Sequence, residues 1–567
     1  AIAMAKPWDA SQSERAGVLN KIADLYEQNF GELFAILSRE AGKTLLDAVA
    51  EIREAVDFLR YYAAQSANFA DKAPRGKFVC ISPWNFPLAI FTGQISAALS
   101  VGNAVLSKPA EPTPIIAARA VELMYQAGVP RDALQLLIGT GREIGATLVS
   151  SPDIDGVCFT GSTATAQTIN ASMAKTGNQF APLIAETGGL NAMIVDSTAL
   201  PEQAVRDIVA SSFQSAGQRC SALRMLYVQH DVSEKFLTML YGAMDELVAD
   251  TPWLATVDVG PVITDVAAKG IQDHIDIADG EGRVMHQSDV PETGTYIRPT
   301  AIRVNGIADM DQEIFGPVLH IATFDADEIS SIVDDINNTG YGLTFGVHSR
   351  IDARVHELCN TLNVGNIYVN RNQIGAVVGS QPFGGEGLSG TGPKAGGPDY
   401  LKQFVQSERG GDAPYSIPNV SRSDAQAKLD AVSRPERMAR DIESLPGPTG
   451  ELNVLSTYAK GVVLCLGPTQ AQADEQAQMA LASGNTPCVI LGLDLDDLAV
   501  LSGFDVAVLW ADETAIRQAR ISLSQRKGML IPLVNDIDVS SRCILERHVC
   551  IDTTAAGGNV ALLAAGT

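Results

Sequence analysis

The stretch KFVCISPWNFPLAIFTG, residues 77–93, shows the pattern that decides the fold. A short apolar run is followed by a turn containing Pro and Asn and then by an apolar segment of helical length. The same order recurs after three further runs, AVLSK from Ala104, LQLLIG from Leu134 and GVCFTG from Gly156. Strand, turn and helix repeated in this way predict an α/β fold with a doubly wound parallel sheet.

The regions on either side of this stretch predict further units. Upstream, apolar residues three and four apart over 18–37 and 45–59 predict two long amphipathic helices. Downstream, the strand-like runs LRMLYVQ, LTFGVHS and GNIYVN alternate with helix-like segments and predict a second α/β lobe. A third α/β unit is expected over 420–556 from the runs KGVVLCLG, TPCVILG, FDVAVLWA and MLIPLVND, with Cys465 and Cys488 in its core.

Composition excludes several classes of protein. The 567 residues include 41 Lys and Arg against 66 Asp and Glu, for a formal net charge of −25. A nucleic-acid backbone or an anionic membrane surface would be repelled, so neither is expected as a partner. Eight cysteines without a C-x-x-C pair predict neither a disulfide framework nor a metal site.

The chain shows no export signal and no apolar run long enough to cross a membrane, so we expect a cytoplasmic protein without a transmembrane segment. It starts without Met, and a helix-like segment begins almost at once. We therefore expect a fragment of a longer protein that is truncated at its N-terminus.

Cys220, in GQRC, precedes a strand-like run and is a candidate nucleophile, with Arg219 beside it to favour the thiolate. A lone cysteine is more often a small buried hydrophobic residue, so position alone does not assign it. A thiol that attacks an aldehyde also needs oxyanion donors, a hydride acceptor and a base. Asn85 in SPWNFP and Glu186 in AETGG follow strand-like runs and have the chemistry for the first and the last of these roles.

A nucleotide site is indicated by two more segments. Lys108 and Glu111 stand three apart after a strand-like run, where they suit vicinal ribose hydroxyls, and a carboxylate there disfavours a 2′-phosphate. Gly161 and Ser162 open a helix-like segment, whose N–H groups suit a pyrophosphate. The glycines of GTGREIG are too unspecific to assign.

Taken together and in order, PWNFP, KPAEPTP, FTGS, ETGG, GQRC, EIFGP and PFGG resemble the aldehyde dehydrogenase superfamily over residues 1 to about 405. The resemblance implies a Rossmann-like NAD-binding lobe at 1–189, a catalytic lobe at 190–390, a return segment and linker at 391–419, and a smaller non-catalytic domain at 420–567. It implies Cys220 as nucleophile, Glu186 as general base, and Asn85 with the Cys220 N–H as oxyanion donors. The NAD contacts that it implies are Ile81, Ser82, Pro83, Trp84, Lys108, Glu111, Gly161, Ser162, Thr187, Gly188, Glu313 and Phe315.

A longer segment, YVNRNQIGAVVGSQPFGGEGLSGTGPKAGGPDYL from Tyr368, resembles the L-glutamate γ-semialdehyde dehydrogenase module of the proline utilization A group. That resemblance implies oxidation of the semialdehyde, which forms from 1-pyrroline-5-carboxylate, to L-glutamate. It also implies a flavin-dependent proline dehydrogenase module upstream. The substrate contacts would be Ser221, Gly375 and Ala376 for the α-carboxylate, Phe86 and Phe383 for the aliphatic stem, and Glu40 for the ammonium.

The motifs depart from the common family pattern at Ala166, where many relatives have Gly, and at Gln312, where Glu is frequent. Other readings remain open: a dehydrogenase of another semialdehyde such as succinate semialdehyde, a fragment that is inactive without its missing start, or a protein whose active site has been lost. A CoA-acylating relative would not need the hydrolytic base, so Glu186 argues against that reaction.

Overall fold

The computed structural model describes residues 1–415 and 419–554. Three helices open the chain, α1 (Gln12–Gln28), α2 (Phe30–Ala41) and α3 (Leu45–Gln65), where the apolar periodicity predicted two. The first predicted helix ends at Asn29, whose N–H still bonds to Leu25, and a second helix starts at the next residue. The apolar residues keep the same spacing on both sides of Asn29, so the periodicity alone did not show that the helix ends there.

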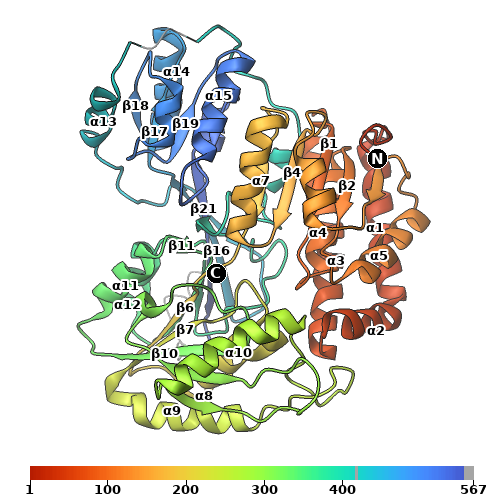
Figure 1. Cartoon of the computed structure of the whole chain (residues 1–567), viewed down its shortest axis with the longest axis vertical. Coiled ribbons are helices and arrows are strands. Elements are labelled where there is room, and N and C mark those ends of the chain that lie inside the picture. The colour runs from red at the N-terminus through yellow and green to blue at the C-terminus, as the bar shows by residue number, and fades with distance from the viewer. Residues whose placement is uncertain (416–418, 555–567) are drawn as a thin grey trace.

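The first α/β layer is a five-stranded parallel sheet in the order β3-β2-β1-β4-β5, as the sequence predicts for a doubly wound fold (Figure 1). Its strands are β1 (Lys77–Ile81), β2 (Ala104–Lys108), β3 (Leu134–Leu136), β4 (Gly156–Thr160) and β5 (Leu183–Glu186). The connecting helices are α4 (Ala89–Ser100), α5 (Pro114–Ala127), α6 (Ala146–Val149) and α7 (Thr163–Thr176). Because all five strands are parallel, the loops after their carboxyl ends lie along one edge.

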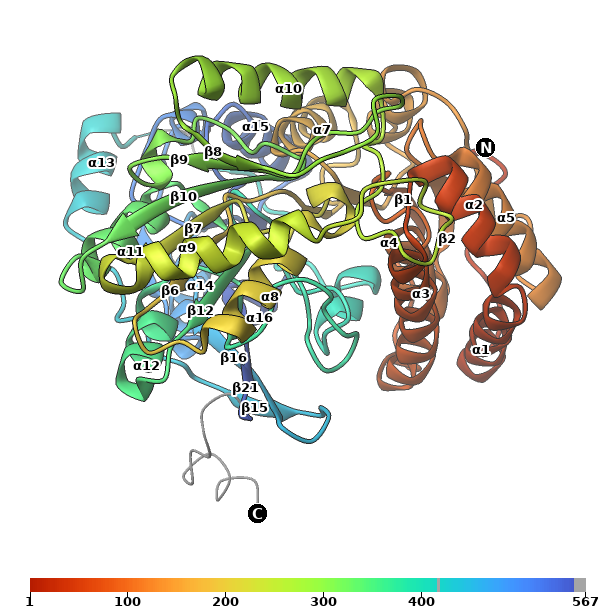
Figure 2. The same ribbon diagram turned by 90° about the horizontal axis from the view of Figure 1, so that it is seen from below.

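The second layer is a ten-stranded sheet in the order β15-β16-β21-β13-β12-β6-β7-β10-β9-β8. The strands from the predicted second lobe are β6 (Ala192–Val195), β7 (Met225–Gln229), β8 (Val284–Gln287), β9 (Thr300–Arg303), β10 (Val318–Phe324), β12 (Thr344–His348) and β13 (Asn366–Val369). The helices that cover it are α8 (Pro201–Phe213), α9 (His230–Asp245), α10 (Asp265–Gly280), α11 (Ile329–Asn338) and α12 (Asp352–Thr361), and Figure 2 shows them around the sheet. A two-stranded pair, β11 (Tyr341–Gly342) and β14 (Glu386–Gly387), joins the glycine-rich loop, residues 375–397, to this lobe.

Three strands from the C-terminal third of the chain complete this second sheet: β15 (Ile442–Leu445), β16 (Glu451–Ala459) and β21 (Ile544–Asp552). Strand β21 runs parallel to β13, with His548 opposite Asn366, and antiparallel to β16. The sequence predicted a third unit in this region. It did not predict that three strands of this unit join the ten-stranded sheet of the second lobe. The expected unit is therefore divided between a shared sheet and a sheet of its own.

That smaller sheet has the order β18-β17-β19-β20 and forms the unit at the top of Figure 1. Its elements are β17 (Val462–Cys465), β18 (Thr486–Val489), β19 (Val506–Val508), β20 (Leu533–Val534), α13 (Arg422–Asp430), α14 (Gln470–Ala482), α15 (Glu513–Ser524) and α16 (Val539–Arg542). Cys465 and Cys488 are buried in its core, as predicted. Arg517 and Arg520 of α15 donate to backbone carbonyls of the segment 174–181, which joins the unit to the first lobe. The expected tail lies outside the described residues from position 555 onward.

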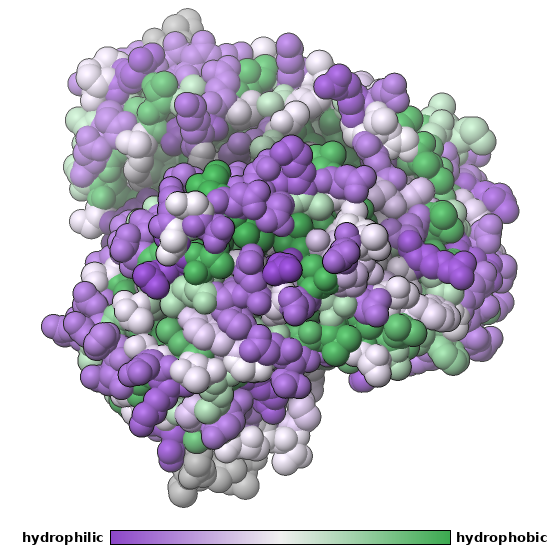
Figure 3. All heavy atoms as spheres, turned by 60° about the horizontal axis from the view of Figure 1, so that its bottom comes forward, coloured by the Kyte–Doolittle hydropathy of each residue, from purple (hydrophilic) through white to green (hydrophobic). Residues whose placement is uncertain are grey.

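The surface of the protein is largely hydrophilic on the face that Figure 3 presents. Figure 3 shows hydrophobic residues as small patches among hydrophilic ones on the face that it presents. Over the described ranges, no helix is both long and apolar enough to cross a membrane.

Candidate active site

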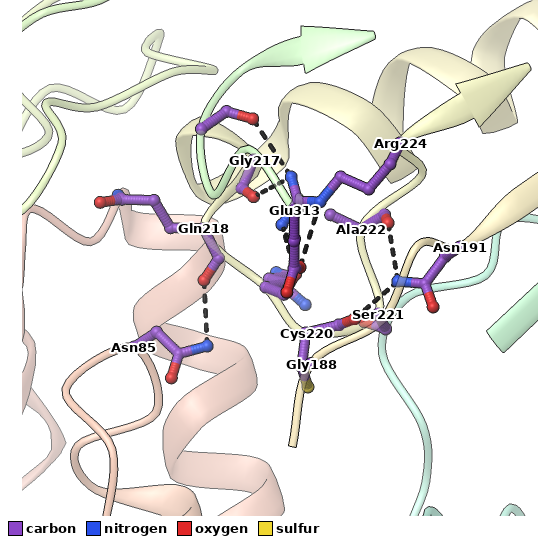
Figure 4. Close-up of polar contacts among 12 residues, drawn as sticks. Asn85, Gly188, Asn191, Gly217, Gln218, Cys220, Ser221, Ala222, Arg224 and Glu313 are labelled. Carbon is purple, nitrogen blue, oxygen red and sulfur yellow. Dashed lines mark hydrogen bonds and ion pairs between the residues drawn. The ribbon is translucent and has the colours of Figure 1, made fainter. Parts of the chain in front are cut away.

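Cys220 lies on the loop between α8 and β7, after a short 3-10 segment at Gln214–Gly217 (Figure 4). Three consecutive residues of that segment have positive φ: Ser215 at 59°, Ala216 at 52° and Gly217 at 67°. A Cβ on Gly217 would lie 2.1 Å from the carbonyl oxygen of Gly316, so only glycine permits this close approach. The sharp turn thereby places the thiol at the edge of its lobe.

Two side chains that sequence reasoning missed hold this loop. Asn191 donates from Nδ2 to the carbonyl oxygens of Cys220, at 2.6 Å, and Ala222, at 2.9 Å. The fully buried guanidinium of Arg224 donates to the carbonyls of Gly217, at 2.7 Å, and Arg219, at 3.0 Å. Asn191 follows the glycines of ETGGLN and Arg224 is a charge inside an apolar run, which are the signals that identify them. The nucleophile loop is thus fixed from both sides.

Asn85 reaches this loop from the first lobe. Its Nδ2 donates to the carbonyl oxygen of Gln218 at 3.0 Å, and its side chain is buried. An amide nitrogen carries two N–H groups, and this bond uses one of them. The predicted oxyanion donor of the first lobe therefore bonds to the loop that carries the predicted nucleophile, two residues before Cys220.

The surroundings of Cys220 oppose thiolate formation in the protein alone. Burial, with smaller effects from the carboxylates of Glu313, Glu186 and Glu54, raises the pKa of its thiol to about 12. The expectation that Arg219 favours the thiolate is wrong. Its guanidinium forms a buried ion pair with Asp47 at 2.8 Å instead.

Glu186 ends β5 and is buried beside the glycine-rich loop. Burial raises the pKa of its carboxyl to about 8, and the ammonium of Lys394 acts in the opposite direction. A Cβ on Gly384 would lie 3.0 Å from Glu186 Oε1, and one on Gly390 would lie 3.2 Å from Oε2. The carboxylate therefore lies against the backbone of this loop, within electrostatic range of Cys220.

The residues predicted to contact NAD lie along the edge formed by the carboxyl ends of the first sheet, or in the loop that faces it. Ile81, Ser82, Pro83 and Trp84 end or follow β1, Lys108 and Glu111 end or follow β2, Gly161 and Ser162 follow β4, and Thr187 and Gly188 follow β5. Glu313 and Phe315 come from the loop before β10, and Phe315 meets the Trp84 ring edge to face at 5.5 Å between ring centroids.

The chemistry of these groups suits a dinucleotide. Lys108 is buried, and burial lowers the pKa of its ammonium. The Glu111 carboxylate accepts from the Gly141 N–H at 2.6 Å, so it is fixed beside the end of β2. Ser162 caps α7, and Ser82 carries a buried hydroxyl that bonds to no partner in the described structure. Such a hydroxyl is suited to a ligand oxygen.

Glu313 is half-buried, with 17% of its side chain exposed. Its Oε1 pairs with Arg224 Nη2 at 3.0 Å, and a Cβ on Gly188 would lie 2.1 Å from its Oε2. Burial raises the pKa of this carboxyl. The predicted residues Glu313 and Gly188 are therefore brought together, and Gly188 is needed for their close approach.

The residues predicted to bind substrate are placed in two groups. Phe86 is half-buried, with Lys43 Nζ 4.7 Å and the Arg219 guanidinium carbon 5.5 Å from its ring centroid. Ser221 is buried next to Cys220, and its carbonyl accepts from Thr344 Oγ1 at 3.2 Å. The glycine-rich loop carries the other three residues, half-buried Ala376 and Phe383 and exposed Gly375 with a φ of 74°.

Glu40, predicted to bind the substrate ammonium, bonds to the backbone of α5. Its carboxylate accepts from the N–H groups of Ile115, at 2.7 Å, and Ile116, at 2.8 Å, and so caps the start of α5. Glu54 on α3 was missed, and it lies near enough to Cys220 to raise the pKa of the thiol. Burial raises the pKa of Glu54 itself to about 8. The available signal was the spacing of Asp47, Glu51 and Glu54. They stand four and three residues apart and so place three carboxylates on one face of the helix.

The described residues contain no group of three or more His, Cys, Asp or Glu placed to hold a metal ion. The site is therefore defined by a cysteine at a fixed turn, an amide from the facing lobe, a buried carboxylic acid and a dinucleotide-type sheet edge.

These features define an enzyme fold of the aldehyde dehydrogenase type, and residues 1–409 match the model of the Aldehyde dehydrogenase family. The chain belongs to this family. It is 41% identical over 630 residues to Bifunctional protein PutA of Salmonella typhimurium, covering 100% of this chain and 48% of that protein. The chain thus spans about half the length of the PutA proteins among its curated relatives.

Two solved structures are also similar. A variant of Bradyrhizobium japonicum Proline Utilization A has a TM-score of 0.69 and 49% identity, over 70% of this chain and 42% of that chain. A 1-pyrroline-5-carboxylate dehydrogenase from Thermus with bound NAD has a TM-score of 0.67 and 34% identity, over 70% of this chain and 81% of that one. The aldehyde dehydrogenase fold predicted from the motifs is confirmed.

Proposed function

We propose that this protein oxidises L-glutamate γ-semialdehyde, formed from 1-pyrroline-5-carboxylate, to L-glutamate with NAD as hydride acceptor. The observation that carries the proposal is the hydrogen bond from Asn85 of the first lobe to Gln218 in the loop of Cys220, with Glu186 in electrostatic range of the thiol. A relative named 1-pyrroline-5-carboxylate dehydrogenase and a relative named Bifunctional protein PutA support the choice of substrate.

The residues along the first sheet suit NAD. We assign Lys108 and Glu111 to the ribose hydroxyls, Ser162 and the start of α7 to the pyrophosphate, and Glu313 to the second ribose, because Ser162 caps α7 and Lys108 ends β2. The Glu111 carboxylate disfavours the 2′-phosphate of NADP. When bound, NAD supplies the hydride acceptor and a positive charge near the thiol.

Each chemical step is assigned to this chain's own groups. The Cys220 thiol releases its proton to solvent and its Sγ adds to the aldehyde carbon, while Asn85 Nδ2 and the Cys220 N–H donate to the oxygen that becomes negative. Loss of hydride from that carbon leaves a thioester on Cys220. Glu186 takes a proton from water, the hydroxide adds to the thioester carbon, and cleavage of the C–S bond releases glutamate and the thiol.

Substrate selection is assigned to both ends of the amino acid. Ser221 and the loop at Gly375 and Ala376 are placed for the α-carboxylate, and Phe86 and Phe383 for the methylenes. We assign the ammonium to Glu54 instead of Glu40, because Glu54 lies near Cys220 whereas Glu40 is occupied by the α5 backbone.

The whole protein is proposed to carry an upstream flavin-dependent proline dehydrogenase module, which would supply 1-pyrroline-5-carboxylate, and to act in the cytoplasm. The relative named Bifunctional protein PutA, of which this chain covers 48%, supports this organisation. Residues 420–567 are proposed to form a non-catalytic domain.

The test is an absorbance assay of NADH with the purified chain, NAD and freshly hydrolysed 1-pyrroline-5-carboxylate, with succinate semialdehyde and NADP as parallel arms. NADH formation that is strong only with the first pair, and lost in Cys220→Ala, supports the proposal. A protein that binds NAD and oxidises succinate semialdehyde equally well contradicts the substrate. A folded protein that binds NAD and forms no NADH contradicts the activity.

A further inference from the structure

Lys394 lies in the glycine-rich loop and is almost completely buried, with 2% of its surface exposed. Its Nζ donates to Asn366 Oδ1 at 2.9 Å and to the carbonyl oxygen of Gly384. Asn366 belongs to β13 and is itself fixed, because its Nδ2 donates to the Pro382 carbonyl at 2.8 Å. Burying an ammonium costs free energy because the group loses its hydration. A lysine kept in such a position therefore indicates a role that needs its charge.

Gly384 separates this ammonium from Glu186. Its carbonyl accepts from Lys394 Nζ, while a Cβ on it would lie 3.0 Å from Glu186 Oε1 and 3.3 Å from Lys394 Cα. Neither oxygen of the Glu186 side chain makes a hydrogen bond of standard geometry in the part of the chain that the structure describes. The carboxylate is held beside a positive charge, and the Lys394 ammonium and the Gly385 N–H both act to lower its pKa against the larger effect of burial.

The C-terminal strand β21 supports Lys394 from the other side. Glu546 accepts from the Lys394 N–H at 2.6 Å. Burial lowers the pKa of the Lys394 ammonium to about 8, and the negative charge of Glu546 acts against that shift. The other charged groups that act on this pair are Glu386, Arg547, Asp399, Lys402 and His548. Arg437, at 2.6 Å, and Arg547, at 3.3 Å, pair with Glu386, so that carboxylate is already compensated.

We propose that Lys394, fixed by Asn366 and by Glu546 of β21, is a positioning residue for Glu186, whose ionised form it favours and which it holds beside the nucleophile until water is activated. This inference rests on the proposed dehydrogenase reaction and deepens it, because it concerns only the hydrolysis of the thioester. Formation of the thioester does not need Glu186, so loss of Lys394 has to slow hydrolysis and spare the first NADH.

The experiment measures pre-steady-state NADH formation and the thioester hydrolysis rate from pH 5.5 to 9.5 in the whole chain. Lys394→Met removes the charge, and an opposite charge within a few ångströms typically lowers the pKa of an acid by about 1–3 units. We therefore expect the midpoint of the rising limb for hydrolysis to move up by about 1–2 pH units. A fast burst of NADH followed by a slow phase should then appear at pH 7, and Lys394→Arg should restore part of the native profile.

Glu546→Gln provides an independent arm if Lys394→Met fails to fold, because Gln keeps an acceptor for the Lys394 N–H. The Glu546 charge raises the pKa of Glu186, so this variant should move the midpoint to lower pH, opposite to Lys394→Met. Glu475→Gln on the exposed face of α14 is the matched control and should leave the profile unchanged.

The outcomes separate the two proposals. A native protein that forms no NADH contradicts the proposed function. A native protein that turns over, with unchanged midpoints in Lys394→Met and Glu546→Gln, overturns the role of Lys394 alone. A Lys394→Met variant in which the first NADH is slowed as much as hydrolysis also overturns it.

Discussion

Arg371, the second residue after β13, forms an ion pair with Glu451 at the start of β16, with 2.5 Å between Nη1 and Oε2. Glu451 also accepts from Gln381 Nε2 at 2.9 Å. Arg371 and Gln381 stand at the two ends of the loop that carries Gly375 and Ala376. A strand from the C-terminal third of the chain therefore fixes both ends of the proposed carboxylate-binding loop.

We expect Glu451→Ala to loosen that loop. Both anchors lose their acceptor, so ordering the loop on substrate binding costs more. The KM for the semialdehyde should rise about tenfold, a loss of about 1.4 kcal/mol, while the KM for NAD stays near its native value. Steady-state kinetics with each substrate varied in turn measure this difference, and Glu475→Gln serves as the control. An equal rise in both KM values would mean that Glu451 acts on the whole fold.

Removal of the oxyanion donor should slow the chemistry and leave cofactor binding intact. Asn85→Ala is expected to lower kcat by about 10²–10³, the usual cost of one such donor. Fluorescence titration with NADH measures cofactor affinity, and a change below about twofold is expected. An Asn85→Ala protein with native kcat would exclude this amide as the main donor.

The thiol of Cys220 should react slowly in the protein without cofactor. Its pKa is raised to about 12, so the thiolate fraction should grow about tenfold per pH unit throughout the range from 7 to 10. The rate of alkylation by iodoacetamide, followed by mass spectrometry of the peptide, tests this, with Cys220→Ala to identify the signal. A plateau below pH 9 would show that a nearby cation lowers the pKa after all.

Glu54 should reduce stability at alkaline pH while it contributes to substrate binding. The folded protein raises the pKa of this carboxyl from 4.5 to about 8, so its stabilising contribution is complete below pH 4.5 and is lost as the pH rises through 8. Glu54→Gln stays neutral, and we expect its Tm at pH 8.5 to exceed the native Tm by a few degrees, with little difference at pH 4.5. Its KM for the semialdehyde should rise, and the KM for propanal, which lacks an ammonium, should not.

Glu40 should contribute to stability alone. Its carboxylate accepts from two N–H groups at the start of α5, and loss of a helix cap costs about 1 kcal/mol. Glu40→Ala is therefore expected to lower the free energy of unfolding in urea by about that amount, with an unchanged KM for the semialdehyde. A KM increase without loss of stability would return Glu40 to the substrate site.

The strands of both lobes were predictable because each is a short apolar run bounded by Gly, Pro or Ser, as in KFVCIS and GVCFTG. The position of β21 was not, because a local pattern identifies a strand and says nothing of its partner. Strand β13 and strand β21 are far apart in the chain, and only the completed sheet shows that they are neighbours.

The same distinction holds for the site. Cys220, Asn85 and Glu186 could be predicted as site residues because the motifs that contain them occur in a fixed order along the chain. Arg219 was misjudged because adjacency in sequence does not fix where a long side chain points, and here it points to Asp47. Lys394 and Glu546 were missed because they are far apart in the sequence. Only the tertiary structure brings the glycine-rich loop, which carries Lys394, against β21, which carries Glu546.

The shared sheet has a consequence for biosynthesis. During translation β13 emerges long before β21, and until then its Ile367 and Val369, buried in the finished sheet, belong to an open edge. Such an edge pairs readily with other chains while it waits, so the nascent protein needs protection until residue 552 has left the ribosome. A shortened gene that stops after residue 409, where the family match ends, would make that exposure permanent and favour aggregation.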